Sequence, residues 1–154
     1  MELKDIMVKN VITVNPNATV KDATKLMNKH NIGCLIVVGK GKVVGIVTER
    51  DILRKIVEAS KNPEKTKVSE IMSTKLLVAA PNMDVVDAAK MMLQRKIKKL
   101  PIVTNKKLVG LVSLTDIVRT VRIEPEIMNV IKDLTKSGWL PPKSMKNIVE
   151  FYTD

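Results

Sequence analysis

Hydrophobic and polar positions follow the same order twice along the chain. In the first half, a short β-rich apolar run is followed by apolar residues at helical spacing, then by two apolar runs of strand length, and then by a second helical pattern. The glycine-rich stretch 39–42 separates the two apolar runs, as is typical of a hairpin turn. The pattern predicts strand, helix, strand, strand and helix over residues 11–14, 20–31, 34–38, 43–47 and 48–57.

Local signals set the ends of the predicted helices. Thr19 and Asp22 have the spacing of a capping box, in which an acid follows a hydroxyl by three residues. We expect Gly33 to take the left-handed position after the first helix. The second helix should begin at Thr48. Its buried side should consist of Ile52, Leu53, Ile56 and Val57.

The second half repeats the first without a gap. Each landmark recurs 65 residues later, as in the pairs Gly45 and Gly110, Thr48 and Ser113, and Asp51 and Asp116. Such a repeat indicates two copies of one supersecondary unit that stack to bury a shared face. The predicted organisation is a first repeat at 1–58, a polar linker at 59–67 and a second repeat at 68–121.

The remainder, 122–154, has no counterpart in the repeat and is predicted to be a helical extension. Pro125 could occupy the first position of a helix that ends at Ser137-Gly138. Its apolar stripe would consist of Ile127, Val130, Ile131 and Leu134. A second short helix would carry Met145, Ile148, Val149 and Tyr152, with Trp139 before it. We expect the extension to dock on the repeats or on a second subunit.

Composition limits the classes of function. The 154 residues are 45% hydrophobic but only 2% aromatic, so the core should be aliphatic, and stacking of bases on an aromatic platform is disfavoured. The net charge of +11 favours an anionic partner, although a lysine-rich surface would give the same value. A single cysteine excludes an intramolecular disulfide. Without a visible signal peptide or an apolar run long enough to insert into a membrane, we expect a cytoplasmic location.

The stretch from Thr48 to Asp51 has chemistry suited to a nucleotide. A hydroxyl at a helix start, together with the helix dipole, favours a phosphate. An ionised aspartate is an acceptor-only group that can take hydrogen bonds from both hydroxyls of a ribose. The same spacing is also that of a capping box, in which these residues only start a helix. Both interpretations apply equally to Ser113 and Asp116.

The whole repeat resembles a tandem pair of cystathionine-β-synthase (CBS) domains, also called a Bateman module, over about residues 3–121. The matching stretches are Asp5-Ile6-Met7, Glu70-Ile71-Met72, Leu100-Pro101-Ile102-Val103, Gly45 to Asp51, and Gly110 to Asp116. The resemblance implies an α+β fold with two βαββα repeats packed about a pseudo-twofold axis. It also implies two clefts that bind an adenosine-containing effector such as AMP, ADP, ATP or S-adenosylmethionine. A homodimer is expected as well.

The resemblance implies roles for particular residues. Asp51 and Asp116 would hold the ribose hydroxyls, and Thr48 and Ser113 would face the phosphate or ribose. Each adenine wall would come largely from the other repeat. The cleft of Asp116 would then be lined by residues around Ile6, Ile32, Gly33 and Cys34. The cleft of Asp51 would be lined by residues around Ile71, Ile97 and Lys98.

The two copies differ at these positions, which predicts two unequal sites. Arg50 is replaced by Thr115, and Gly33-Cys34 by Lys98-Lys99. Arg50, Lys98 and Lys99 are candidate phosphate contacts, with a simple solvated role as the alternative for each. The first copy also has Ile36 where the second has Pro101, a departure from the Leu-Pro usual in the family.

These observations favour a regulatory, ligand-sensing module rather than an enzyme. His30 and Cys34 are four residues apart, but their repeat partners are Arg95 and Lys99, so a catalytic or metal site is not expected. The regulated protein is not identified by the sequence. The alternative function is nucleic-acid binding by the basic surface, with or without gating by a nucleotide.

Overall fold

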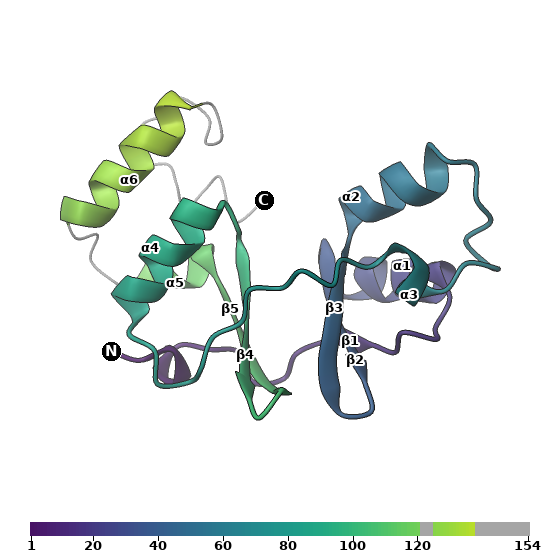
Figure 1. Cartoon of the computed structure of the whole chain (residues 1–154), viewed down its shortest axis with the longest axis horizontal. Helices are drawn as coiled ribbons and strands as arrows, with labels where there is room; N and C mark the ends of the chain where they lie inside the picture. The colour runs from purple at the N-terminus through teal and green to yellow at the C-terminus, as the bar shows by residue number, and fades with distance from the viewer. Residues whose placement is uncertain (121–124, 138–154) are drawn as a thin grey trace. The chain divides into compact units, whose positions relative to one another are not determined.

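The structure is a computed structural model that describes residues 1–120 and 125–137, and these form two compact units (Figure 1). The first-repeat unit contains Asn10–Leu77 and Asn105–Leu108. The second-repeat unit contains Met1–Lys9, Val78–Thr104 and the described residues from Val109 onward. Both mix helices and strands, which confirms the predicted α+β class.

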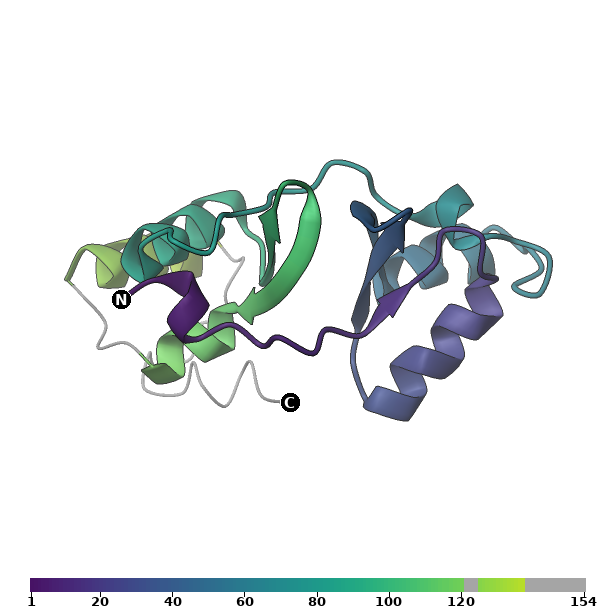
Figure 2. The same cartoon turned by 90° about the horizontal axis from the view of Figure 1, so that it is seen from below.

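The first-repeat unit has the predicted order of elements around a three-stranded sheet. Strand β1 is parallel to β2, and β2 is antiparallel to β3. Helix α1 packs on β2 (Figure 2). Its buried residues are Val20, Ala23 and Met27. The elements are β1 (Thr13–Val14), α1 (Val20–His30), β2 (Cys34–Gly39), β3 (Lys42–Thr48), α2 (Glu49–Ile52), the π-helix η2 (Leu53–Val57) and α3 (Val68–Ile71).

The second-repeat unit follows the same plan, but its first strand is reduced to one residue. Ala79 pairs in parallel with Ile102, and its N–H donates to the Pro101 oxygen at 3.0 Å. Strands β4 and β5 then form the two-stranded sheet. The elements are the 3₁₀-helix η1 (Leu3–Asp5), α4 (Val85–Arg95), β4 (Lys99–Thr104), β5 (Lys107–Ser113), α5 (Leu114–Thr120) and α6 (Pro125–Lys136).

Helix α6 confirms the first predicted helix of the extension. It lies beside α4 within the second-repeat unit, so this part of the extension docks on a repeat as expected (Figure 1). The predicted second helix, with Met145, Ile148, Val149 and Tyr152, and also Trp139, lie outside the described residues. Among the described residues, no helix combines the length and apolar character needed to cross a membrane.

The predicted hairpin turn and the first cap are present. Lys40 and Gly41 have φ values of 53° and 75°, the left-handed pair expected in a two-residue turn between β2 and β3. The Asp22 N–H donates to Thr19 Oγ1 at 3.1 Å at the start of α1. The sequence therefore determines these two boundaries through short-range backbone requirements.

The predicted role of Gly33 is wrong. The left-handed residue after α1 is Asn31, with φ 52° and ψ 49°, and Lys96 takes the same conformation after α4. Asparagine tolerates this region because its short polar side chain can bond locally. Gly33 instead accepts a hydrogen bond from the Glu49 N–H at 3.0 Å, at the start of α2.

The predicted burial of the second helix is wrong for two residues. Ile56 is buried, but Leu53 and Val57 are 61% and 65% exposed. The helix changes to π hydrogen bonding here, as shown by the Glu58 N–H that donates to the Leu53 oxygen at 2.9 Å. A π turn is wider than an α turn, so it shifts the following side chains around the helix axis.

Each unit also includes a short segment that comes, in the sequence, just before the first strand of the other repeat. In the second-repeat unit, the N-terminal segment pairs with β5 through Val8 and Leu111, whose N–H groups donate to each other's oxygens at 2.9 and 3.0 Å. In the first-repeat unit, Ser73 pairs with Ile46 of β3 in the same way, at 2.8 and 3.0 Å. The compact units are therefore not consecutive stretches of the chain.

The signature glycines permit this pairing. A Cβ atom on Gly45 would lie 2.7 Å from Met72 Sδ and 2.9 Å from the Ser73 oxygen. A Cβ atom on Gly110 would lie 2.8 Å from Met7 Cγ. Real Cβ atoms do not approach neighbours so closely. The glycine of each signature thus allows a crossing segment, Met72-Ser73 or Met7-Val8, to lie directly on the strand.

We expect Gly45→Ala to lower the free energy of unfolding by about 1–3 kcal/mol, because the added methyl group meets backbone as well as the Met72 side chain. The matched control is Gly33→Ala, whose Cβ would meet only the flexible end of Glu49. It should change stability by less than about 0.5 kcal/mol, as substitutions with room to adjust usually do. Urea denaturation of both variants measures the difference. Equal losses would contradict this role of the signature glycine.

Candidate functional site

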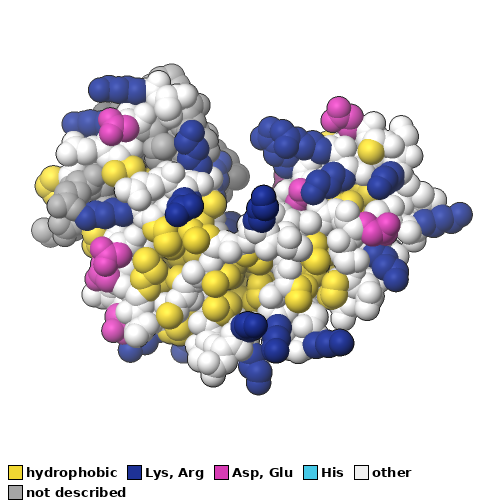
Figure 3. Space-filling view, in the orientation of Figure 1, with side chains coloured by type: hydrophobic (Ala, Val, Ile, Leu, Met, Phe, Trp, Pro, Cys, Tyr) yellow, Lys and Arg dark blue, Asp and Glu magenta, His cyan; other side chains and the backbone are white. Residues whose placement is uncertain are grey.

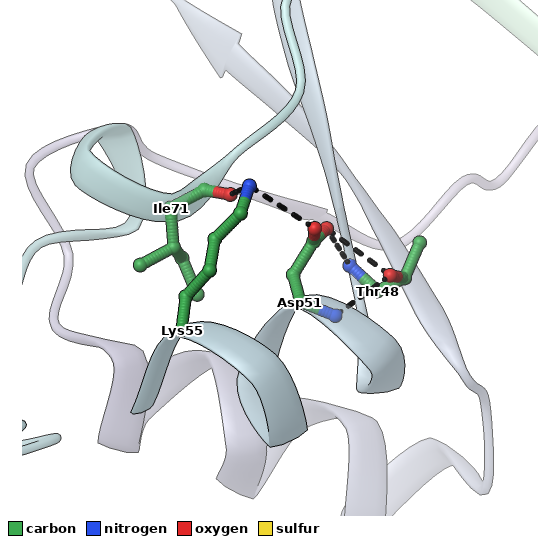
Figure 4. A network of polar contacts seen from close by, with 4 residues as sticks. All are labelled: Thr48, Asp51, Lys55 and Ile71. Atoms are coloured by element: carbon green, nitrogen blue, oxygen red, sulfur yellow. Dashed lines mark hydrogen bonds and ion pairs between the residues drawn. The ribbon is translucent and has the colours of Figure 1, made fainter. Parts of the chain in front are cut away.

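The candidate site in the first-repeat unit is the corner where β3 ends and α2 begins (Figure 4). The Asp51 N–H donates to Thr48 Oγ1 at 3.2 Å, and the Thr48 N–H donates to Asp51 Oδ2 at 2.9 Å. The Thr48 hydroxyl also donates to Asp51 Oδ2 at 3.1 Å. These bonds form a reciprocal capping box, so the capping interpretation of the signature is confirmed here.

The same corner occurs between β5 and α5 in the second-repeat unit. The Ser113 N–H donates to Asp116 Oδ2 at 2.9 Å, and the Asp116 N–H donates to Ser113 Oγ at 3.0 Å. Ser113 is buried and Asp116 is half-buried. The duplicated signature thus produces the same backbone geometry twice, with an aspartate held in a defined orientation each time.

Capping does not use the full acceptor capacity of the Asp51 carboxylate. An ionised carboxylate has two oxygens and about four lone-pair sites. The two cap bonds that the carboxylate accepts both end on Oδ2, whereas Oδ1 faces Lys55 (Figure 4). The Asp51 side chain is 18% exposed, so it is partly open to solvent. The cap therefore fixes the direction of the carboxylate and leaves its second oxygen for another partner.

Lys55 is a component of this corner that the sequence analysis missed. Its ammonium lies 3.3 Å from Asp51 Oδ1 and donates to the Ile71 oxygen at 2.7 Å (Figure 4). The signal was available, because opposite charges four residues apart on a helix face each other. At the matching position of the second repeat stands Thr120, whose hydroxyl donates to the Asp116 backbone oxygen at 2.7 Å. The two corners therefore differ in a charged group beside the aspartate.

The other predicted site residues lie at different depths. Ile71 is 1% exposed and belongs to the hydrophobic core, so only its backbone oxygen reaches the corner. Cys34 pairs with Thr48 across β2 and β3. The half-buried residues are Ile6, Ile32, Cys34 and Ile97, and the exposed ones are Gly33, Arg50, Lys98 and Lys99.

Two of these residues lie beside the corner of their own repeat. Gly33 accepts from the Glu49 N–H at 3.0 Å, and Lys98 accepts from the Leu114 N–H at 2.9 Å through their backbone oxygens. Ile71 is in the same unit as Asp51, and Ile6 is in the same unit as Asp116. The other lining residues belong to a different unit from the aspartate they are predicted to accompany. These are Ile32, Gly33 and Cys34 for the cleft of Asp116, and Ile97 and Lys98 for the cleft of Asp51. Their place in those clefts stays a prediction.

Side chains of both charges are exposed on the face drawn in Figure 3. On the face in Figure 3, Lys and Arg side chains are scattered over both units, with Asp and Glu side chains among them. An exposed example is the Lys21–Glu64 ion pair at 2.7 Å, where the neighbouring ammonium holds the pKa of Glu64 below its ordinary value. Nucleic-acid binding stays a prediction from net charge. Within residues 1–120 and 125–137, no group of three His, Cys, Asp or Glu side chains is placed to hold a metal.

The chain belongs to the CBS-domain family. The CBS domain model matches residues 3–58 and 68–123, so two CBS domains stand in tandem, as the resemblance of the sequence indicated. A relative from Bacillus subtilis, the CBS domain-containing protein YhcV, is 43% identical over 115 residues. That match covers 75% of this chain and 81% of YhcV.

Solved structures show the same fold. The conserved CBS domain protein TA0289 of unknown function from Thermoplasma acidophilum matches with a TM-score of 0.72 and 29% identity, over 86% of this chain and 75% of that one. The CBS domain pair of protein MJ0100 matches with a TM-score of 0.68 and 33% identity, over 77% and 94%. The MJ0100 pair was solved in complex with 5′-methylthioadenosine and S-adenosyl-L-methionine.

We expect Thr48→Ala and Ser113→Ala each to lower the free energy of unfolding by about 1 kcal/mol, because each removes the oxygen that accepts the N–H of the aspartate. Thr24→Ala is the control. The Thr24 hydroxyl only donates to the Val20 oxygen within α1, so its loss should be close to neutral. Thermal and urea denaturation compare the three variants. A loss at Thr24 as large as at the two corners would contradict the capping role.

Proposed function

We propose that this chain is a regulatory module that binds an adenosine-containing metabolite, with AMP, ADP, ATP and S-adenosylmethionine as the candidates. Asp51 and Asp116 accept hydrogen bonds from the ribose hydroxyls in this proposal. The observation that carries it is the pair of oriented carboxylates, one at each β-to-helix corner of a CBS-domain pair. The adenosyl compounds bound by the MJ0100 pair support the ligand class.

The physical basis is the acceptor chemistry of the two corners. A ribose presents two adjacent hydroxyl donors, and a carboxylate with a fixed direction accepts both by charge-assisted bonds. Because the cap already orients Asp51 and Asp116, little side-chain entropy is lost on binding. Arg50, Lys98 and Lys99 are exposed cations that can reach a negatively charged substituent of the ligand, and the half-buried Ile6, Ile32 and Ile97 can cover an adenine ring.

Regulation follows in this proposal if the ligand has different affinities for two states of the module, because a ligand shifts an equilibrium only by that difference. The protein that responds to the shift, a homodimeric assembly and a cytoplasmic location stay predictions. The chain is proposed to act without catalysis. In support, the relative YhcV is named only for its CBS domains and not for an enzymatic activity.

The test is isothermal titration calorimetry with AMP, ATP and S-adenosylmethionine on the wild-type chain and on Asp51→Asn and Asp116→Asn. Asparagine keeps a carbonyl oxygen for the cap and removes the charge that the ribose requires. We expect each variant to lose at least about tenfold in affinity at one site, as the loss of a charge-assisted hydrogen bond does. Unequal wild-type sites are also expected.

Asp22→Asn is the matched control, because Asp22 follows its cap residue by three positions, as Asp51 does, but stands on α1. It should leave every affinity unchanged. Circular dichroism verifies that all three variants are folded. Absence of binding to the wild-type chain, or unchanged affinity in both corner variants, would refute the proposed function.

A further inference from the structure

The ammonium of Lys55 lies beside the oxygen of Asp51 that the cap does not use. It is 3.3 Å from Asp51 Oδ1, and its second contact is the Ile71 backbone oxygen at 2.7 Å. Within the first-repeat unit, a group that binds Asp51 through Oδ1 therefore meets Lys55 as a competitor. A ribose diol is such a group in the proposed function, on which this inference rests.

We infer that Lys55 determines the ligand charge accepted at the Asp51 corner, so that this corner selects an adenosine compound with an anionic substituent, such as a nucleoside monophosphate, over the uncharged nucleoside. An uncharged nucleoside that binds the Asp51 carboxylate displaces the Lys55 ammonium. It has no anionic group that could bind the ammonium instead. A ligand with a phosphate replaces the lost carboxylate contact with a new charge-assisted bond to the same ammonium.

The geometry of Lys55 permits this exchange. Its side chain is 45% exposed, so it is open to solvent and to a bound ligand. The pair is exposed on the Lys55 side only, since Asp51 is 18% exposed. Exposed ion pairs contribute about 0–1 kcal/mol, so the cost of giving up this partly exposed pair is modest and a new bond to the ammonium can offset it. Lys55 also stands in the π-helix, and such turns occur frequently at functional sites. The uncharged Thr120 at the matching position explains why the same selection is not expected at the Asp116 corner.

The experiment measures AMP and adenosine affinities by calorimetry in a chain with Asp116→Asn, so that only the Asp51 corner is observed. In Lys55→Thr, which installs the residue of the second repeat, we expect AMP to bind about fivefold more weakly, as for a partly exposed ion pair. Adenosine should bind as well as before or more tightly, because its competitor is gone. A purely structural role of Lys55 would move both affinities in the same direction.

Two controls separate this effect from net charge and from folding. Lys21→Thr removes one positive charge from an exposed ion pair, with Glu64, and should change neither affinity. Lys55→Arg keeps the cation and should retain the preference for AMP, whereas Lys55→Met should lose it while keeping the aliphatic stem. The Lys55→Met variant also replaces Lys55→Thr if the threonine variant does not fold.

The failure of this inference can be told from the failure of the proposed function. If AMP and adenosine bind, and Asp51→Asn abolishes both, an unchanged affinity ratio in Lys55→Thr and Lys55→Met overturns only the role of Lys55. The same conclusion follows if Lys21→Thr weakens AMP as much as Lys55→Thr does. If neither compound binds the chain before Lys55 is changed, the proposed function fails and this inference fails with it.

Discussion

The reciprocal hydrogen bonds between an aspartate and the last residue of a strand are the interaction on which both corners depend. The Asp51 carboxylate accepts from the Thr48 N–H, and the Thr48 hydroxyl accepts from the Asp51 N–H. These two bonds end β3, begin α2 and fix the direction of the carboxylate together. Capping and ligand binding are therefore compatible, because the bonds that start the helix also hold Asp51 in a defined orientation.

A second constraint is the close passage of a chain segment over each strand that leads to a corner. A glycine leaves room for Met72-Ser73 on β3 and for the Met7 side chain on β5. In the first-repeat unit the crossing segment begins directly after Ile71, whose backbone oxygen accepts from Lys55. The ammonium thus joins the aspartate to the start of the crossing segment. A ligand that draws Lys55 away from Asp51 would also act on this contact, which gives the proposed regulation a physical route inside one unit.

Much of the fold follows from short-range signals in the sequence. The hairpin at Lys40-Gly41, the cap at Thr19 and helix α6 depend on local backbone requirements, and each was predicted correctly. The left-handed Asn31 was missed because the neighbouring Gly33 satisfies the same rule. The exposure of Val57 was missed because a π turn leaves no signal in hydrophobic spacing.

The candidate site was less predictable, since its partners come from distant parts of the chain. The 65-residue repeat identified both capped aspartates, but no local pattern brings Ile71 to Lys55 or places the N-terminal segment on β5. These contacts depend on which segments pair after the chain has folded.

The two repeats have kept the same cap and changed the charges around it. Arg50 and Lys55 accompany Asp51, whereas the buried Thr115 and the exposed Thr120 stand at the matching positions near Asp116. In the proposed function, a difference confined to the surroundings of an unchanged cap would alter ligand preference with little effect on folding, because exposed charges contribute little to stability. Two corners with one geometry and different charges would then bind different members of the proposed ligand class. If both ligands favour different states of the module, linkage requires that each change the affinity for the other by the same factor.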